Sequence, residues 1–227
     1  METPSICLVI DCVSGGCGLG LFKAQAGSID AIAQQCLTMQ RGQAEIIIPT
    51  IKALMDHAQC EFSSIDFIVV NVGPGSYTGI RVGLAAAHGL SLAAGAKIIG
   101  VSAVDALLHQ DQTALCALEA GREDVILATA ETPPEIVELD AIPDWVASAI
   151  KNQQPIKLVG NALDRVQKIA SIYPMGMFEF GDAAPAALYD FADLGFEAYK
   201  KAQASGIFPP ITPLYLRPAS ITKPTKA

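Results

Sequence analysis

A glycine-rich segment is the clearest candidate for chemistry in this sequence. Between an apolar run and a long helical pattern, the chain reads Gly73-Pro74-Gly75-Ser76-Tyr77-Thr78-Gly79. Such a loop can bind phosphate, because free N–H groups and the helix dipole point out of it. A P-loop, however, would end in Gly-Lys-Ser/Thr, and a Rossmann fingerprint would need a glycine where Thr78 stands. Two interpretations stay open: a nucleotide-binding loop, or a tight turn whose helix is capped by Ser76 or Thr78.

Residues suited to acid–base or metal chemistry are few and scattered. Asp11 is placed like the metal carboxylate of a kinase, but the Ser-Gly-Gly turn after it favours a turn-capping role. The three histidines, His57, His88 and His109, lie far apart in sequence, which is poor material for a metal site. A serine nucleophile would need a neighbouring base, and the pattern indicates none. We therefore predict no catalytic residue, no metal and no cofactor.

The cysteines allow two interpretations. None of the six forms a C-x-x-C pair: Cys7, Cys12, Cys17, Cys36, Cys60 and Cys116. Cys12 and Cys17 could be half of a metal site, although zinc prefers four ligands at closed spacings. We favour small buried apolar residues in a reducing compartment.

Composition limits the partners and the compartment. The 227 residues are 51% hydrophobic and 17% charged, with a net charge of −8. This is enough apolar material for a folded core, and the acidic surface should repel phosphate backbones. The start of the chain lacks a basic leader, and the longest uncharged apolar run, 82–96, is too short to cross a bilayer. We expect a cytoplasmic protein without membrane contact that binds nucleic acid poorly when alone.

Hydrophobic periodicity predicts the elements that must position these residues. In the first half we expect three strands, a helix, a strand, a helix, a strand and a short helix, at 5–12, 17–24, 29–38, 42–58, 65–72, 78–94, 97–101 and 102–109. In the second half we expect two strands, a helix, a strand and two helices, at 113–120, 124–130, 143–151, 156–159, 161–170 and 185–205. Pro49 is expected to kink its helix, Asn161 to cap the helix that it begins, and the tail from residue 207 to be mostly irregular.

The order of elements predicts two related α/β lobes with mixed sheets flanked by helices. Three strands followed by alternating helix and strand are the repeat unit of the actin-like, sugar-kinase and Hsp70 superfamily, a ribonuclease H-like fold. We place the lobes at 1–104 and 105–227, with the helix at 185–205 and the tail free to pack back on the first lobe.

The helix after the glycine loop carries a stripe with almost no side chain. Small residues recur at every fourth position: Gly79, Gly83, Ala87, Ser91 and Gly95. Interior glycines cost about 0.5–1 kcal/mol each relative to Ala, so close approach to a neighbour should offset them. The neighbour can be the chain's own sheet, a partner helix, or one on each side.

The loop and the start of this helix resemble a known family. Residues 73–83, GPGSYTGIRVG, match the G-P-G-S-[FY]-T-G-[LI]-R-[IV]-G signature of the TsaB family, also called YeaZ, with Arg81 as its arginine. Four weaker matches follow in the expected order: Leu8-Val9-Ile10-Asp11, Arg41-Gly42-Gln43-Ala44-Glu45 with Pro49, Ile99-Gly100-Val101-Ser102, and Pro213-Leu214-Tyr215-Leu216-Arg217. Together they bracket nearly the whole chain.

This resemblance implies an actin-like fold and a role in making threonylcarbamoyladenosine at position 37 of tRNA. It implies a non-catalytic scaffold that pairs with the catalytic paralogue TsaD, helps to recruit the ATPase TsaE and meets tRNA only through the complex. Where the catalytic relatives hold a metal with an H-x-x-x-H pair, this chain has Ser102 and Ala106. It also departs from the family at 119–126, where EAGREDVI replaces D-A-R-x-x-E-V-Y.

The expected interface is an apolar face shared by the two long helices of the first half. The candidate contacts with TsaD are Ile47, Ile51, Leu54, Met55, Val82, Ala86, Leu90 and Ala93. Without the partner, the same face is expected to self-pair as a homodimer. The competing interpretations are a nucleotide-dependent kinase or hydrolase of the same superfamily, which would need two phosphate-binding hairpins, and a metallopeptidase, which the missing histidines disfavour.

Overall fold

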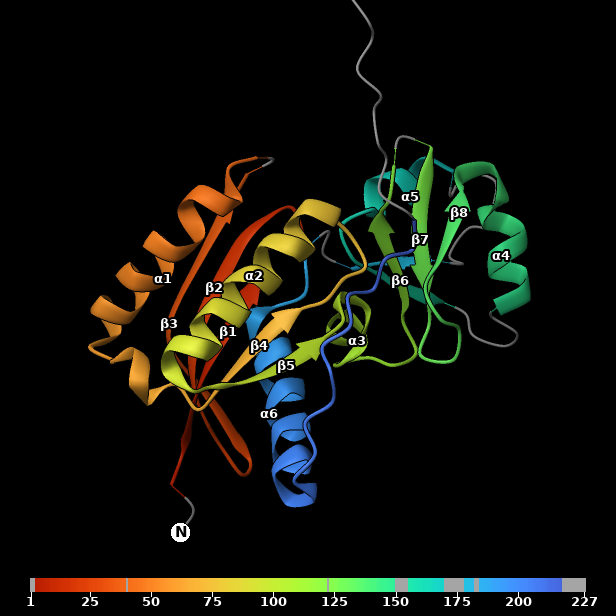
Figure 1. The fold of residues 1–227 in the computed structure, drawn as a ribbon. Coiled ribbons are helices and arrows are strands. Elements are labelled where there is room, and N and C mark those ends of the chain that lie inside the picture. Colours follow the sequence, from red (N-terminus) through yellow and green to blue (C-terminus); the bar gives the residue numbers. More distant parts are fainter. Residues whose placement is uncertain are drawn as a thin grey trace, which may run out of the picture.

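The strands of each half form a five-stranded sheet of their own, so the chain contains two sheets (Figure 1). The computed structural model describes residues 3–39, 41–121, 123–149, 155–169, 178–181 and 184–217. The first sheet contains β1 (Ser5–Asp11), β2 (Gly16–Gln25), β3 (Ser28–Thr38), β4 (Phe67–Asn71) and β5 (Lys97–Val101). The second contains β6 (Leu115–Glu119), β7 (Asp124–Ala128), β8 (Glu135–Glu138), β9 (Ile156–Val159) and β10 (Phe178–Phe180).

Both sheets have the same connectivity. Their strand orders are β3-β2-β1-β4-β5 and β8-β7-β6-β9-β10. In each sheet the first three strands form an antiparallel meander, and the last two run parallel to the first strand. The predicted pair of α/β lobes with mixed sheets is confirmed. The two strands expected at 113–120 and 124–130 form the antiparallel pair β6–β7, in the position that β1–β2 holds in the first sheet.

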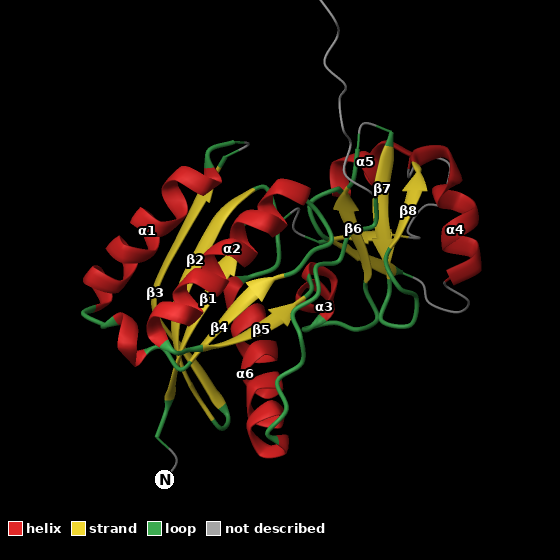
Figure 2. Ribbon diagram, viewed as in Figure 1, coloured by secondary structure: helices red, strands yellow, loops and turns green. Residues whose placement is uncertain are grey.

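Helices cover both faces of the first sheet (Figure 2). On one face α1 (Gln43–Ala58) and α2 (Tyr77–Ala94) lie side by side, and α1 continues through Pro49. On the other face lies α6 (Leu188–Ser205), whose Phe191 and Tyr199 pack against strand residues. The rings of Tyr199 and Phe67 stack with centroids 4.3 Å apart. This apolar sandwich is what holds β1 and β4, and the loops at their ends, in place.

The second sheet is covered in a similar way. Helices α4 (Ile142–Ala149) and α5 (Leu163–Ile169) pack on one face, where Val146 and Val166 are fully buried. The short helix α3 (Ala103–Leu108) packs on the other face with Cys116 and Leu118 of β6. Two short 3-10 turns, Phe62–Ser64 and Leu139–Ala141, complete the connections.

The last helix of each half packs on the sheet of the other half. Helix α3 follows β5 of the first sheet, yet its apolar side chains join the core of the second. Helix α6 follows β10 of the second sheet, yet it packs on β1, β2, β4 and β5 of the first. This exchange links the two lobes into one folding unit.

Most predicted elements lie near their predicted bounds, with a few differences. The pattern does not predict β8 and β10, which have 4 and 3 residues. Helix α6 begins at Leu188 instead of residue 185, and the predicted ends at Lys151 and Ala170 and the tail beyond Arg217 lie outside the described residues. Helix α5 begins two residues after Asn161, whose Oδ1 accepts a hydrogen bond from the Glu119 N–H at 2.9 Å. In the described part of the chain, no helix is long and apolar enough to cross a membrane.

Candidate functional site

The glycine-rich loop joins β4 to α2 and turns sharply at two glycines. Gly73 and Gly75 have φ angles of 103° and 148°, which side chains rarely allow. Ser76 is the N-cap of α2, because its Oγ accepts a hydrogen bond from the Gly79 N–H at 3.1 Å. Of the two predicted caps, Ser76 is therefore confirmed, and Thr78 lies exposed in the first helical turn.

Three of the six N–H groups of residues 73–79 that could hold a phosphate donate hydrogen bonds within the chain. The Gly73 N–H donates to Asn71 Oδ1 at 2.9 Å, and the Ser76 N–H donates to the Val13 carbonyl at 3.4 Å. The Gly79 N–H is used by the cap. A phosphate cradle needs such groups free and pointing outward. This loop therefore has the geometry of a tight structural turn.

The signature residues divide into a buried and an exposed set. Gly73, Pro74 and Gly79 are buried, and the Gly73–Pro74 peptide bond is cis. The exposed members are Gly75, Ser76, Thr78 and Arg81. Close packing explains the buried set, since the Gly73 Cα approaches both Ile80 and the Leu214 carbonyl too closely for a Cβ.

The small-residue stripe of α2 faces the chain's own sheet. A Cβ at Gly79 would overlap the carbonyl oxygen of Cys12 at the end of β1. A Cβ at Gly83 would lie 3.5 Å from Val70 and 3.7 Å from Ile10, which is ordinary packing distance. Gly79 thus allows the start of α2 to sit directly on β1, the intramolecular alternative of the prediction, whereas Gly83 has room for a side chain.

Asp11 closes the β1–β2 turn as predicted. Its Oδ1 accepts hydrogen bonds from the Val13 N–H at 2.8 Å, the Ser14 N–H at 3.3 Å and the Asn71 side chain at 2.9 Å. Asp11 and Asn71 are both buried, so this bond ties the ends of β1 and β4 together. The sequence pattern did not identify Asn71, because the two residues lie 60 positions apart.

A cavity of about 960 Å³ lies between the two lobes, beside the glycine loop. The first lobe lines it with Ser14, Gly15 and the loop, and the second with Glu119 and Asn161. Among the described residues that line it, Arg217 is the one cation, and its guanidinium is held by Asp124 Oδ2 at 2.6 Å. A nucleoside triphosphate would bring several negative charges, and of the described lining residues only Arg217 carries a positive charge.

The C-terminal segment brings a distant motif to the same place. The Leu214 N–H donates to the Val72 carbonyl at 2.8 Å, which lays the segment along the start of the loop. The rings of Tyr215 and Tyr77 then meet with centroids 4.7 Å apart, and the Arg81 guanidinium lies 5.6 Å from the Tyr77 centroid. The signature at 73–83 and the C-terminal match at 213–217 are therefore in contact in the folded chain.

The predicted contact residues of α1 require a correction. Ile47, Ile51, Leu54 and Met55 are all buried and pack against the chain's own first sheet. The apolar stripe of α1 is therefore used inside the monomer, and so is Ala86 of α2. Helical periodicity identifies an apolar stripe, but the surface that it faces is decided by the fold.

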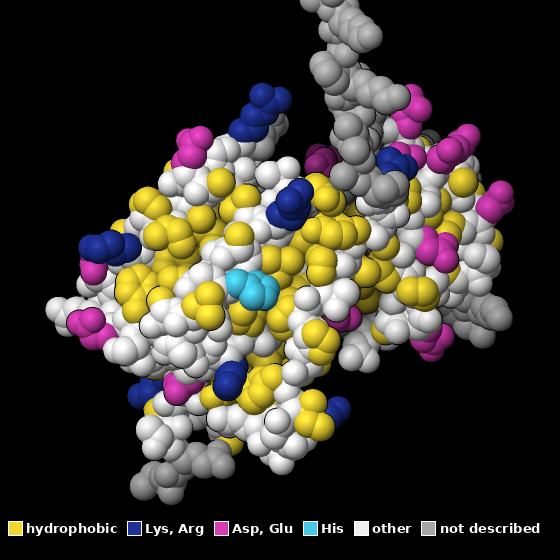
Figure 3. Space-filling model, in the orientation of Figure 1, with side chains coloured by type: hydrophobic (Ala, Val, Ile, Leu, Met, Phe, Trp, Pro, Cys, Tyr) yellow, Lys and Arg dark blue, Asp and Glu magenta, His cyan; other side chains and the backbone are white. Residues whose placement is uncertain are grey.

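Other apolar side chains of the two helices remain at the surface. Ile48 of α1 is 47% exposed and Leu92 of α2 is 89% exposed. Val82 and Leu90, from the predicted set, are partly buried, and Ala93 is exposed. In Figure 3 apolar side chains gather over the α1–α2 pair and beside it, toward β5. An exposed apolar patch of this kind often marks a site of contact with another protein.

The histidines and the metal-ligand positions offer no centre. His57 and His88 are exposed on α1 and α2, and His109 Nε2 lies 2.8 Å from Asp193 Oδ2 of α6. Ser102 caps α3 through the Asp105 N–H at 3.0 Å. Within the described ranges, no three His, Cys, Asp or Glu side chains are placed to hold a metal.

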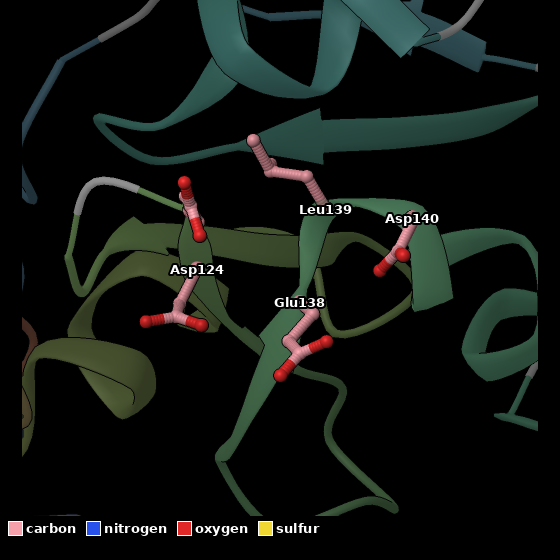
Figure 4. A pocket seen from close by; sticks show the side chains of 5 residues that line it. Asp124, Glu138, Leu139 and Asp140 are labelled. Carbon is pink, nitrogen blue, oxygen red and sulfur yellow. The ribbon is translucent and has the colours of Figure 1, made fainter.

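The second lobe contains a more acidic cavity, of about 600 Å³, that sequence reasoning did not identify. It is lined by Glu123, Asp124, Glu138, Leu139 and Asp140. Figure 4 shows Asp124, Glu138 and Asp140 at its wall, and among the described residues these carboxylates form no group of three that could hold a metal. Asp124, in the hairpin that departs from the family pattern, is instead bound by Arg217. Arg122 of that hairpin lies outside the described residues.

Comparisons with known proteins agree on one family. Residues 37–192, more than half of the chain, match the family described as TsaD, tRNA N6-adenosine threonylcarbamoyltransferase. A Haemophilus influenzae protein named tRNA threonylcarbamoyladenosine biosynthesis protein TsaB is 27% identical over 52% of this chain and 50% of its own length. The Escherichia coli protein of that name is 30% identical over 42% of this chain and 39% of its own. The chain thus aligns with half or less of these relatives.

A solved structure gives the same fold. It is described as an uncharacterized protein with similarity to peptidase YEAZ from Pseudomonas aeruginosa. It superposes with a TM-score of 0.70 at 18% identity, covering 94% of this chain and 100% of that one. The fold is therefore that of the actin-like class, with two mixed five-stranded sheets flanked by helices.

Proposed function

This chain belongs to the TsaB family, also called YeaZ, and from that membership we propose that it is a non-catalytic scaffold subunit for tRNA N6-threonylcarbamoyladenosine synthesis. In this proposal it pairs with a TsaD-like catalytic subunit and helps to recruit a TsaE-like ATPase. The tRNA reaches it only through the complex. When the partner is missing, two copies pair through the same face.

One observation carries the non-catalytic part of the proposal. The loop that could have held a nucleotide directs three of its six N–H groups to Asn71, Val13 and Ser76. The loop serves to seat α2 on β1 and to hold the C-terminal segment. A nucleotide-dependent kinase or hydrolase that used this loop, the alternative function, would need these groups free for phosphate.

The exposed part of the α1–α2 pair supports the choice of docking surface. Because Ile51 and its neighbours are buried in the monomer, the contacts are reassigned to Ile48 and Leu92, together with Val82, Leu90 and Ala93 of the predicted set. Leu92 is 89% exposed, so its burial by a partner would remove apolar surface from water and favour association. An interface of this kind is most sensitive at its central apolar anchors.

The interface is tested by charge substitution at the two exposed anchors. Ile48→Asp and Leu92→Asp should each weaken binding to purified TsaD by tenfold or more in calorimetry, because a buried unpaired carboxylate opposes association. Ile207→Asp is the matched control, since Ile207 is 72% exposed but follows α6. The circular dichroism spectra of all three should match the parent protein. Unchanged affinity for both anchor variants would place the interface elsewhere.

The non-catalytic assignment has its own test. The isolated chain, mixed with ATP and Mg²⁺, should show neither a binding isotherm in the micromolar range nor release of phosphate. Turnover of ATP by this chain alone would favour the kinase or hydrolase instead.

A further inference from the structure

Two cysteine side chains meet at the open end of the β1–β2 hairpin. Cys12 Sγ and Cys17 Sγ are 3.7 Å apart, with Cys12 as the hydrogen-bond donor. The strand register pairs Asp11 with Gly18, so Cys12 and Cys17 are the next cross-strand neighbours. Antiparallel partners have Cα atoms about 4.5–5.5 Å apart, inside the range of about 4.4–6.8 Å that a disulfide spans. The pair therefore lies within the backbone separation that a disulfide spans.

The pair has a route to small solutes in spite of its burial. Both side chains are about 1% exposed, but Cys12 is part of the wall of the cavity between the lobes. That cavity, about 960 Å³, readily admits a molecule little larger than water. Cys17, like Cys7 and Cys116, is not among its lining residues, but the Cys17 sulfur lies 3.7 Å from that of Cys12.

We propose that Cys12 and Cys17 are an oxidisable dithiol. Hydrogen peroxide converts the pair to a disulfide, which shifts the residues at the end of β1 against which the glycine loop packs. The Cys17 thiolate attacks one peroxide oxygen, the O–O bond breaks, and the leaving hydroxide takes a proton to become water. Cys12 then attacks the sulfenic acid sulfur and displaces a second hydroxide, which is also protonated. In total two thiols lose two hydrogens, and one peroxide becomes two waters.

The hydrogen bond between the thiols assigns these roles. It lowers the pKa of Cys17, the acceptor, although burial and Asp11 oppose the change. The same bond, with burial, raises the pKa of Cys12, the donor. Thiolate character governs reaction with peroxide, so Cys17 is the first nucleophile and Cys12 the resolving thiol.

The disulfide would act on the glycine loop through direct contacts. The carbonyl of Cys12 lies against the Gly79 Cα, and the Val13 carbonyl accepts from the Ser76 N–H. Closing the sulfur separation from 3.7 Å to about 2.05 Å pulls on this corner of β1. Because cytosolic disulfides are usually transient and redox-sensing, the bond should be reversed by a dithiol reductant.

Mass spectrometry of the reduced full chain after equimolar peroxide tests the proposal. Trypsin releases residues 1–23 as one peptide, which holds Cys7, Cys12 and Cys17. After denaturation and alkylation this peptide should carry one alkyl group, on Cys7, and be lighter by two hydrogens at the other two cysteines. Dithiothreitol should restore three alkylated cysteines. Hydrogen–deuterium exchange should be faster at the Gly79 amide in the oxidised protein.

Two variants separate the pair from the other thiols. Cys17→Ala should abolish the disulfide, whereas Cys7→Ala, on the opposite face of β1, should leave it unchanged. Three alkylated cysteines after peroxide, or oxidation confined to the exposed Cys36, would overturn the proposal. A disulfide without any change in Gly79 exchange would overturn its coupling to the loop. The wild-type measurement decides the matter even if a variant fails to fold.

Discussion

Single atoms decide the shape of the glycine loop. Ser76 caps α2 and Asp11 closes the β1–β2 turn. Asn71 bonds both the Asp11 carboxylate and the Gly73 N–H. The first two roles could be predicted from local patterns, since caps and turns involve residues within three positions. The Asp11–Asn71 bond and the contact of Gly79 with Cys12 could not, because they join residues about sixty positions apart.

The closest of these contacts predicts a steric requirement at Gly79. Gly79→Ala should lower the free energy of unfolding by about 1–3 kcal/mol, because the new Cβ overlaps the Cys12 carbonyl and forces the backbone to shift. Urea denaturation followed by circular dichroism measures this change. Gly89→Ala is the control in the same helix, with open space around its Cα. It should gain up to about 1 kcal/mol, and equal losses in both variants would contradict the steric explanation.

Among the helices and strands, α1 shows what periodicity can and cannot decide. The spacing of Ile47, Ile51 and Leu54 correctly indicates a helix with one apolar stripe. It does not indicate whether the stripe faces the sheet or a partner, and the sheet covers it. The strands β8 and β10 were missed for a related reason: 4 and 3 residues are too few to show alternation.

Two isoleucines of α1, three positions apart, allow a direct test of this assignment. Ile51→Ala should cost about 2–5 kcal/mol of unfolding free energy, because it leaves a cavity in a fully buried site. Ile48→Ala should cost much less, because half of that side chain is already in water. Denaturant midpoints at unchanged slope give both values. A larger loss for Ile48 would show that α1 presents its other face to the sheet.

For the molecule as a whole, charge limits what the chain does alone. Its net charge is −8. The segment from β6 through α4 contains 8 acidic residues, among them Glu119, Glu131 and Asp144, and a single basic residue, Arg122. Phosphate backbones are repelled by such a surface. The division into lobes could be predicted from sequence because the order of elements repeats. Which helix covers which sheet could not, because that depends on contacts between the two halves.

This charge predicts how the isolated chain behaves toward tRNA. In fluorescence anisotropy at about 0.15 M salt, labelled tRNA should show no saturable binding to the chain alone. Lowering the salt should not produce binding, because the force between the acidic chain and the phosphates is repulsive at every salt concentration. Binding should appear once purified TsaD is added. Tight binding by the chain alone would mean that a local surface overrides the net charge.

The exchange of α3 and α6 between the lobes has a consequence for synthesis on the ribosome. The strands of the first sheet are all made by Val101, but the helix that covers Phe22, Phe67 and Val69 is made only after the entire second sheet. Until then one face of a finished sheet stays open to water and to other nascent chains. A chaperone that binds exposed apolar strands can therefore bind this face for longest during synthesis. If the chaperone dissociates before α6 has packed there, the exposed face favours aggregation.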